Sequence, residues 1–223
     1  ITMGIKIIKE IKKTIKDSEK SNARLVNEYV CGNNKWPKFV PGMQKPALDY
    51  FNEAHDVARH LLRGFALGLG LQENFFLRNT SQPLSRASYV YYPQQSESMG
   101  EDQFGAGPHT DFGVLTVLCQ DSVGGLQVKD LNGDWVYAPP LDETLIVNVG
   151  DLLSRWTDGV YRSTPHRVIN KSNQERLSLV LAFDPSAETM IDARTIFGSK
   201  YISKEKPISC GDYLTWRFNK AFS

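Results

Sequence analysis

A histidine and an aspartate lie two residues apart in the stretch GPHTDFG (107–113), directly before the apolar run 114–118. On an extended strand alternate side chains share a face, so the imidazole of His109 and the carboxylate of Asp111 can reach one point. A further imidazole, that of His166, lies far downstream in another segment of strand-like composition. Two imidazoles and one carboxylate form a facial set that suits Fe(II) and leaves coordination positions open. The sequence therefore predicts a metal centre at these three side chains.

An arginine and a serine follow the distal histidine, again two residues apart. Arg176 and Ser178 belong to the strand-like stretch 176–183 and are expected on one face of it. A guanidinium fork beside a hydroxyl is a carboxylate receptor. Each of these residues alone is equally typical of a turn, a core or a surface ion pair, but the ordered set favours a metal centre with an anion receptor beside it.

This ordered set resembles the 2-oxoglutarate and Fe(II)-dependent dioxygenases, especially the branch related to isopenicillin N synthase. The resemblance covers roughly residues 33–222. It extends to five further short stretches, which are GNNKWP (32–37), YYP (91–93), GGLQV (124–128), VNVGD (147–151) and STPHRV (163–168).

The resemblance implies that His109, Asp111 and His166 hold Fe(II). It implies that 2-oxoglutarate fills two of the open positions through its C1 carboxylate and keto oxygen, and that O2 takes the third. The expected activity is oxidation of a small-molecule substrate, most commonly hydroxylation, with desaturation or ring closure as related outcomes.

The far carboxylate of 2-oxoglutarate is expected at Arg176, with Ser178 and the phenol of Tyr92 as further partners. Burying that carboxylate is costly unless it is paired, so an arginine with hydroxyl donors meets the physical requirement. Phe104 and Phe183 are expected to line the substrate pocket.

Two other functions stay open. Isopenicillin N synthase uses its Arg-x-Ser pair for the carboxylate of its own substrate, and the plant oxidase of aminocyclopropane carboxylate retains such a pair. An oxidase of the same fold that does not use 2-oxoglutarate is therefore the first alternative. A non-catalytic jelly-roll binding protein is the second.

The pattern of short strands predicts a mainly β fold. Between residues 85 and 185 turn residues recur every eight to twelve positions without a βαβ rhythm, which favours two packed antiparallel sheets. The resemblance implies a double-stranded β-helix, a cupin-like jelly roll, with flanking helices. The expected strands are 87–92, 114–119, 125–131, 135–138, 145–149, 151–156, 160–162, 164–170 and 176–183, and residues 94–107 are expected to form a loop.

We expect one structural domain in three parts. Residues 1–84 are a helical cover, with an amphipathic helix at 5–16, a longer helix from about Pro46 to Gly68 and a shorter one at 72–76. Residues 85–185 are the oxygenase core, and residues 186–223 end in a helix that packs on the barrel. The strand and helix block with which relatives begin is not found before Gly32, so this member is shortened or the given chain omits residues.

Composition excludes several classes of partner. The 223 residues carry a formal net charge of +1, which gives no general attraction to nucleic acid or to an anionic membrane. No apolar run approaches the length of a membrane span. Three widely spaced cysteines suggest neither a disulfide framework nor a zinc knot, which favours a reducing, cytoplasmic setting. The expected partner is a small molecule, and a monomer is favoured.

Overall fold

A computed structural model describes residues 34–36, 38, 42–94, 104–170 and 172–222. The amphipathic helix expected at 5–16 lies outside the described residues, as do Cys31 and part of the GNNKWP stretch.

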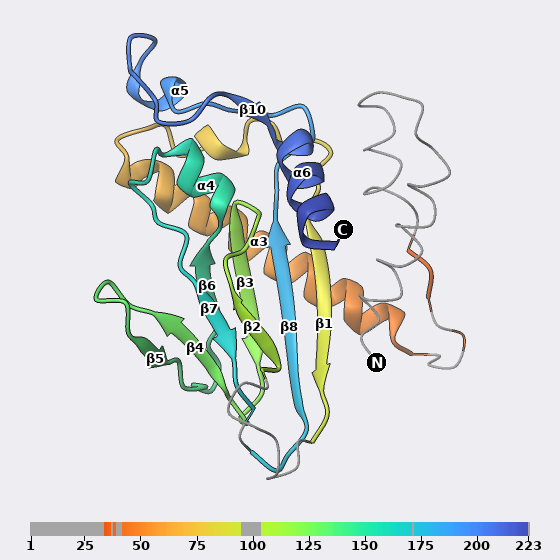
Figure 1. Cartoon of the computed structure of the whole chain (residues 1–223). Helices are drawn as coiled ribbons and strands as arrows, with labels where there is room; N and C mark the ends of the chain where they lie inside the picture. The colour runs from red at the N-terminus through yellow and green to blue at the C-terminus, as the bar shows by residue number, and fades with distance from the viewer. Residues whose placement is uncertain (1–33, 37, 39–41, 95–103, 171, 223) are drawn as a thin grey trace.

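Two four-stranded antiparallel sheets face each other and form the core of the fold (Figure 1). The larger sheet has the order β1-β8-β3-β6 and the smaller sheet the order β2-β7-β4-β5. This arrangement is the predicted jelly roll, the double-stranded β-helix. The strands are β1 (Arg86–Tyr92), β2 (Ala106–His109), β3 (Leu115–Gln120), β4 (Leu126–Lys129), β5 (Trp135–Tyr137), β6 (Ile146–Val149), β7 (His166–Val168) and β8 (Arg176–Phe183).

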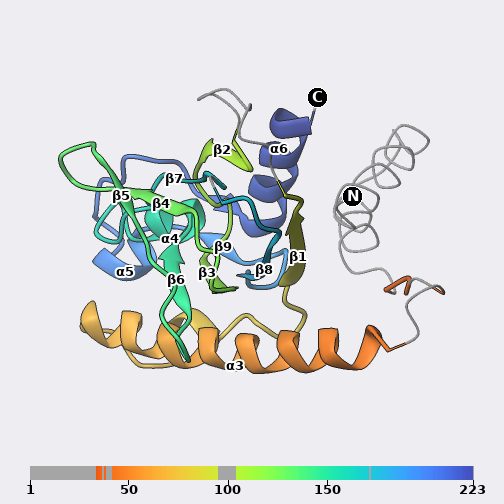
Figure 2. The same cartoon turned by 90° about the horizontal axis from the view of Figure 1, so that it is seen from below.

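A long helix, α3 (Gln44–Gly68), covers the face of the larger sheet that is turned away from the smaller sheet (Figure 2). Its buried side is mostly alanine, with Ala58 and Leu62 fully buried. Small side chains let the helix lie close to the strands, and Tyr50 donates from this helix to the carbonyl oxygen of Leu179 in β8, 2.7 Å away. The helix expected from residue 46 is confirmed.

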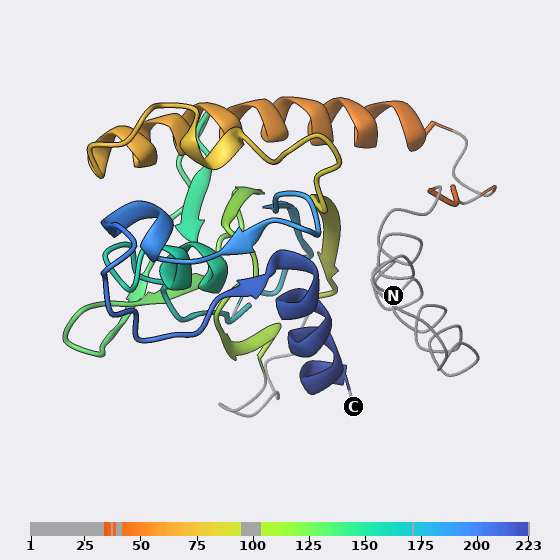
Figure 3. The same ribbon diagram turned by 90° about the horizontal axis from the view of Figure 1, so that it is seen from above.

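The other helices and short strands flank the sheets. Helix α6 lies on the opposite side of β1 and β8 from α3 (Figure 3), so the predicted C-terminal helix is also confirmed. The remaining elements are η1 (Phe75–Leu77), α4 (Asp151–Trp156), β9 (Met190–Ile191), α5 (Arg194–Phe197), β10 (Ile208–Ser209) and α6 (Cys210–Phe222).

Four local predictions were wrong. The segment expected as a strand at 151–156 is helix α4, and residues 160–162 form no strand. The loop expected at 94–107 contains part of strand β2, which begins at Ala106, and a 3₁₀ turn at 75–77 replaces the helix expected at 72–76. Leu152, Leu153 and Trp156 are all buried, and so short an apolar run does not distinguish a strand from a single helical turn.

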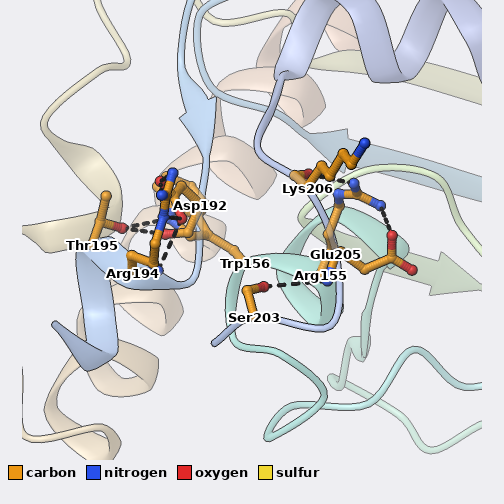
Figure 4. A network of polar contacts seen from close by, with 8 residues as sticks. All are labelled: Arg155, Trp156, Asp192, Arg194, Thr195, Ser203, Glu205 and Lys206. Atoms are coloured by element: carbon orange, nitrogen blue, oxygen red, sulfur yellow. Dashed lines mark hydrogen bonds and ion pairs between the residues drawn. The ribbon is translucent and has the colours of Figure 1, made fainter. Parts of the chain in front are cut away.

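Polar contacts attach α4 to the segment that leads into α6 (Figure 4). The indole Nε1 of Trp156 donates to Thr195 Oγ1 at 3.2 Å, and Arg155 pairs with Glu205 at 2.9 Å. Helix α4 is therefore held from outside the jelly roll as well as by its own buried leucines.

The described cysteines are free. Cys119 is half-buried, and Cys210 is buried in the main core, where burial raises the pKa of its thiol. Cys210 therefore stays protonated and packs as a small apolar group. Within the described part of the chain, none of the helices is long and apolar enough to cross a membrane.

Two leucines of α3 test how the helix is held. Leu62 is 0% exposed and Leu67 is 60% exposed. We expect Leu62→Ala to lower the free energy of unfolding by about 2–5 kcal/mol, because it leaves a cavity against the sheet. Leu67→Ala should change it by less than about 0.5 kcal/mol. Urea denaturation measures both values, and equal effects would contradict this packing.

Candidate metal centre

Three side chains converge between the two sheets. His109 ends β2 and His166 begins β7, and the two are register partners with ring centroids 4.3 Å apart. Asp111 lies on the link from β2 to β3. One ligand atom from each of the three residues lies within 4.8 Å of the others, which is within reach of a single ion.

Backbone carbonyls orient both imidazoles. His109 Nδ1 lies 2.7 Å from the carbonyl oxygen of Gly107, and His166 Nδ1 lies 3.1 Å from that of Thr164. Because a carbonyl oxygen only accepts, each Nδ1 carries the proton and each Nε2 keeps a free lone pair. This is the arrangement that metal-binding histidines require.

The first turn of α4 holds the link that carries Asp111. The Asp151 amide donates to the carbonyl oxygen of Asp111 at 2.8 Å, and the Leu152 amide donates to that of Gly113 at 3.0 Å. A Cβ atom at Gly150 would overlap the Gly113 carbonyl oxygen, so this approach requires glycine.

A buried carboxylate, which the sequence analysis did not single out, holds the same link from the other side. Asp184 accepts from the Val114 amide at 3.1 Å and pairs with Arg86 at 2.9 Å. Burial raises the pKa of this carboxyl group against the lowering effect of Arg86. A Cβ atom at Gly113 would lie 2.5 Å from Asp184 Oδ1, so glycine is required here as well.

Arg176 is a fully buried cation with neutral partners. Its Nε donates to the carbonyl oxygen of Gly124, Nη1 to Ser178 Oγ at 3.2 Å and Nη2 to Gln120 Oε1 at 3.3 Å. These bonds use three of the five N–H donors and leave one on each terminal nitrogen. No acidic side chain among the described residues forms an ion pair with it. A buried charge without a counter-ion is costly, so this fork suits an incoming carboxylate.

The structure brings the predicted partners of Arg176 together. Tyr92 is its register partner on β1, and the guanidinium carbon lies 4.7 Å from the centre of the tyrosine ring. Tyr92 is 8% exposed, whereas the neighbouring Tyr91 is 41% exposed. Gln120 and the carbonyl oxygen of Gly124 were missed. The position of Gln120 follows only from the register that pairs it with Ser178.

The two predicted pocket phenylalanines are not brought to this cluster. Phe183 is fully buried and lies 4.9 Å from the ring of His55 in α3, on the outer face of the larger sheet. Phe104 lies 5.5 Å from the guanidinium of Arg167, whose side chain alternates with that of His166. Both aromatic rings therefore occupy the faces opposite to the metal-binding side chains.

The donor set fits the ion that the sequence predicts. Two neutral imidazoles and one carboxylate provide the nitrogen and oxygen ligands and the facial geometry that suit Fe(II). His55 of α3 stacks on Phe51 with 5.6 Å between ring centroids, and burial lowers its pKa. It takes no part in the cluster.

The sequence is similar to a protein family and to several curated proteins. Residues 81–185 match the family model of the 2OG-Fe(II) oxygenase superfamily. A homoarginine-6-hydroxylase of Glycine max is 33% identical over 86% of this chain and 60% of its own. A 2-oxoglutarate-Fe(II) type oxidoreductase of Emericella nidulans is 38% identical over 68% of this chain and 45% of its own. The chain thus spans roughly half the length of these curated relatives.

Solved structures share the fold. A full-length protein of Neurospora crassa, solved in complex with alpha-KG, has a TM-score of 0.79 and 29% identity, over 85% of this chain and 61% of its own. JOX2 in complex with 2OG, Fe and JA has a TM-score of 0.74 and 28% identity, over 81% of this chain and 54% of its own. The sequence match spans β1 to β8 and the cluster between them, and the chain belongs to the 2OG-Fe(II) oxygenase superfamily.

Proposed function

We propose that this protein is an oxygenase that uses Fe(II), 2-oxoglutarate and O2 to oxidise a small-molecule substrate, most commonly by hydroxylation. The observation that carries the proposal is the convergence of ligand atoms from His109, Asp111 and His166 within 4.8 Å. The names of the relatives support 2-oxoglutarate as the cosubstrate, in preference to an oxidase that lacks one or a metal-free binding protein.

Bound iron supplies the activation of O2 and the redox chemistry. In the overall reaction O2 accepts four electrons. Two come from 2-oxoglutarate, which is converted to succinate and CO2 and takes one oxygen atom. The other two come from a substrate C–H bond, which becomes C–OH with the second oxygen atom.

The protein contributes ligands, an anion receptor and a site between two sheets. Asp111 brings one negative charge, and the contacts of both Nδ1 atoms with carbonyl oxygens leave each Nε2 as the atom that can bind the ion. We propose that the far carboxylate of 2-oxoglutarate pairs with the free N–H groups of Arg176, with Ser178 beside it and the ring of Tyr92 against the guanidinium.

The substrate is proposed only as a small organic molecule. The similar proteins have been named for homoarginine or solved with thymine or with JA, which differ in charge and shape. Such differences are expected where one fold carries many activities. The net charge of +1 supports neither nucleic acid nor a membrane as a partner.

Turnover without added substrate tests the proposed reaction. We expect uncoupled formation of succinate and CO2 that requires both Fe(II) and 2-oxoglutarate. His166→Ala should reduce it to background because it removes a metal ligand. The matched control is His60→Ala, since His60 is exposed on α3 and its Nδ1 contacts the Asp56 carbonyl oxygen of the same helix. Oxygen uptake without a 2-oxo acid, or full turnover in His166→Ala, would contradict the proposal.

Thermal stability tests the anion receptor separately from turnover. At a concentration 100 times its dissociation constant, a ligand stabilises the fold by about 2.7 kcal/mol. For a chain of this size we expect 2-oxoglutarate with Zn(II) to raise the Tm by about 5–10 °C. Arg176→Met should lose most of this shift.

Arg167→Met is the matched control for that measurement. Arg167 lies on β7 beside His166, but its side chain contacts Gln127 and the ring of Trp135 on the opposite face. Its Tm shift should equal that of the wild type. Equal shifts in all three proteins would show that Arg176 does not hold the ligand.

A further inference from the structure

Two side chains hold one oxygen of the proposed metal-ligand carboxylate. Thr116 Oγ1 donates to Asp111 Oδ2 at 2.6 Å, and Asn148 Nδ2 donates to the same oxygen at 2.7 Å. Asn148 belongs to the VNVGD stretch and Thr116 to the apolar run after Asp111, and neither was given a role by the sequence.

These two donors form a single cross-strand pair. Thr116 on β3 and Asn148 on β6 are register partners, so their side chains lie on the same face of the larger sheet. Leu115 and Val117, the neighbours of Thr116, are fully buried on the face under α3. The pair therefore points toward the smaller sheet, where Asp111 lies.

The distribution of the bonds leaves the two carboxylate oxygens unequal. Each oxygen offers about two lone-pair positions, and both positions of Oδ2 are occupied by these donors. Oδ1 accepts no hydrogen bond within the described residues and lies 3.7 Å from His166 Nε2. Oδ1 is thus the oxygen that faces the imidazoles and is free to bind an ion.

We propose that Thr116 and Asn148 are positioning residues that restrict Asp111 to one-oxygen coordination of the metal. This inference rests on the proposed function, because it assigns Asp111 to the ion. Two-oxygen coordination would occupy a further position, whereas the proposed reaction needs two positions for the C1 carboxylate and keto oxygen of the cosubstrate and a third for O2. The cross-strand pair keeps those positions open.

A purely structural role predicts a different outcome. Thr116 is 3% exposed, and its bond to Asp111 also satisfies a buried hydroxyl group. If that were its whole purpose, its removal would lower folding stability without changing how a folded protein binds metal. Outer partners of metal ligands, in contrast, typically contribute 10- to 100-fold to metal affinity.

Anaerobic titration with Co(II) alone separates the two roles. Each variant is titrated as the full chain, and the visible absorption gives both the dissociation constant and the coordination number. We expect Thr116→Val and Asn148→Leu each to weaken Co(II) binding by about tenfold or more. Their spectra should also change, because a carboxylate that binds through both oxygens occupies a position that one-oxygen binding leaves open.

Two further variants serve as controls. Thr116→Ser keeps the hydroxyl and should restore the wild-type affinity and spectrum. Thr189→Val removes another buried threonine hydroxyl, one that donates to the Asn79 carbonyl oxygen at 3.3 Å, and should leave the titration unchanged. If Thr116→Val does not fold, Asn148→Leu alone decides the question, because Asn148 is only half-buried.

The outcomes separate this inference from the proposed function. Co(II) binding by the wild type that is unchanged in Thr116→Val and Asn148→Leu would overturn the positioning role. Absence of specific Co(II) binding by the wild type would overturn the metal centre itself. Weakened binding together with an altered spectrum and rescue by Thr116→Ser supports the proposal.

Discussion

The two-residue period of β-strands, applied to two facing sheets, is the constraint on which this site depends. Along β8, Arg176 and Ser178 face the interior between the sheets, while Leu181 and Phe183 face α3. The same period places His166 inside and Arg167 outside on β7. A shift of one residue in either strand would exchange the polar and apolar faces, so packing of α3 on the leucines also fixes where the polar groups point.

Two buried charged groups near the site, Asp184 and Arg176, differ in their partners. Asp184 has a cation, Arg86, at 2.9 Å and an amide donor at 3.1 Å, so its charge is compensated within the protein. Arg176 is equally buried but has only neutral partners among the described residues. The first pair stabilises the link that carries Asp111. The second group depends on a ligand for its counter-ion, which is why we associate it with function.

The sequence alone predicted those features that depend only on the spacing of residues along one segment. Arg176 and Ser178 alternate on one strand, so their shared face follows from their spacing. His109 ends β2 and Asp111 follows two residues later on the link to β3, so the spacing brought both to the cluster although they do not share a strand. The helix at 44–68 was predictable from its period, since its apolar positions extend over several turns. The double-stranded β-helix was implied by the resemblance alone, because local patterns do not specify which strands pair.

The wrong or missing predictions depended on contacts between segments that are distant in the sequence. Phe183 lies on the expected strand, but its side chain points away from the metal-binding residues. Its direction becomes clear only from the packing of α3 against that face of the sheet. Helix α4 is short, and its first amides donate to the carbonyl oxygens of Asp111 and Gly113, which lie about forty residues earlier in the chain. The Thr116 and Asn148 pair likewise depends on the register of β3 with β6. Long-range contacts of this kind have no local signature.

A crystal structure with Mn(II) and 2-oxoglutarate, determined without O2, tests the central claim most directly. We predict that Nε2 of His109, Nε2 of His166 and a single oxygen of Asp111 bind the ion. The far carboxylate of the ligand should lie within hydrogen-bonding distance of the terminal nitrogens of Arg176. An ion bound elsewhere, or a ligand carboxylate away from Arg176, would contradict this account.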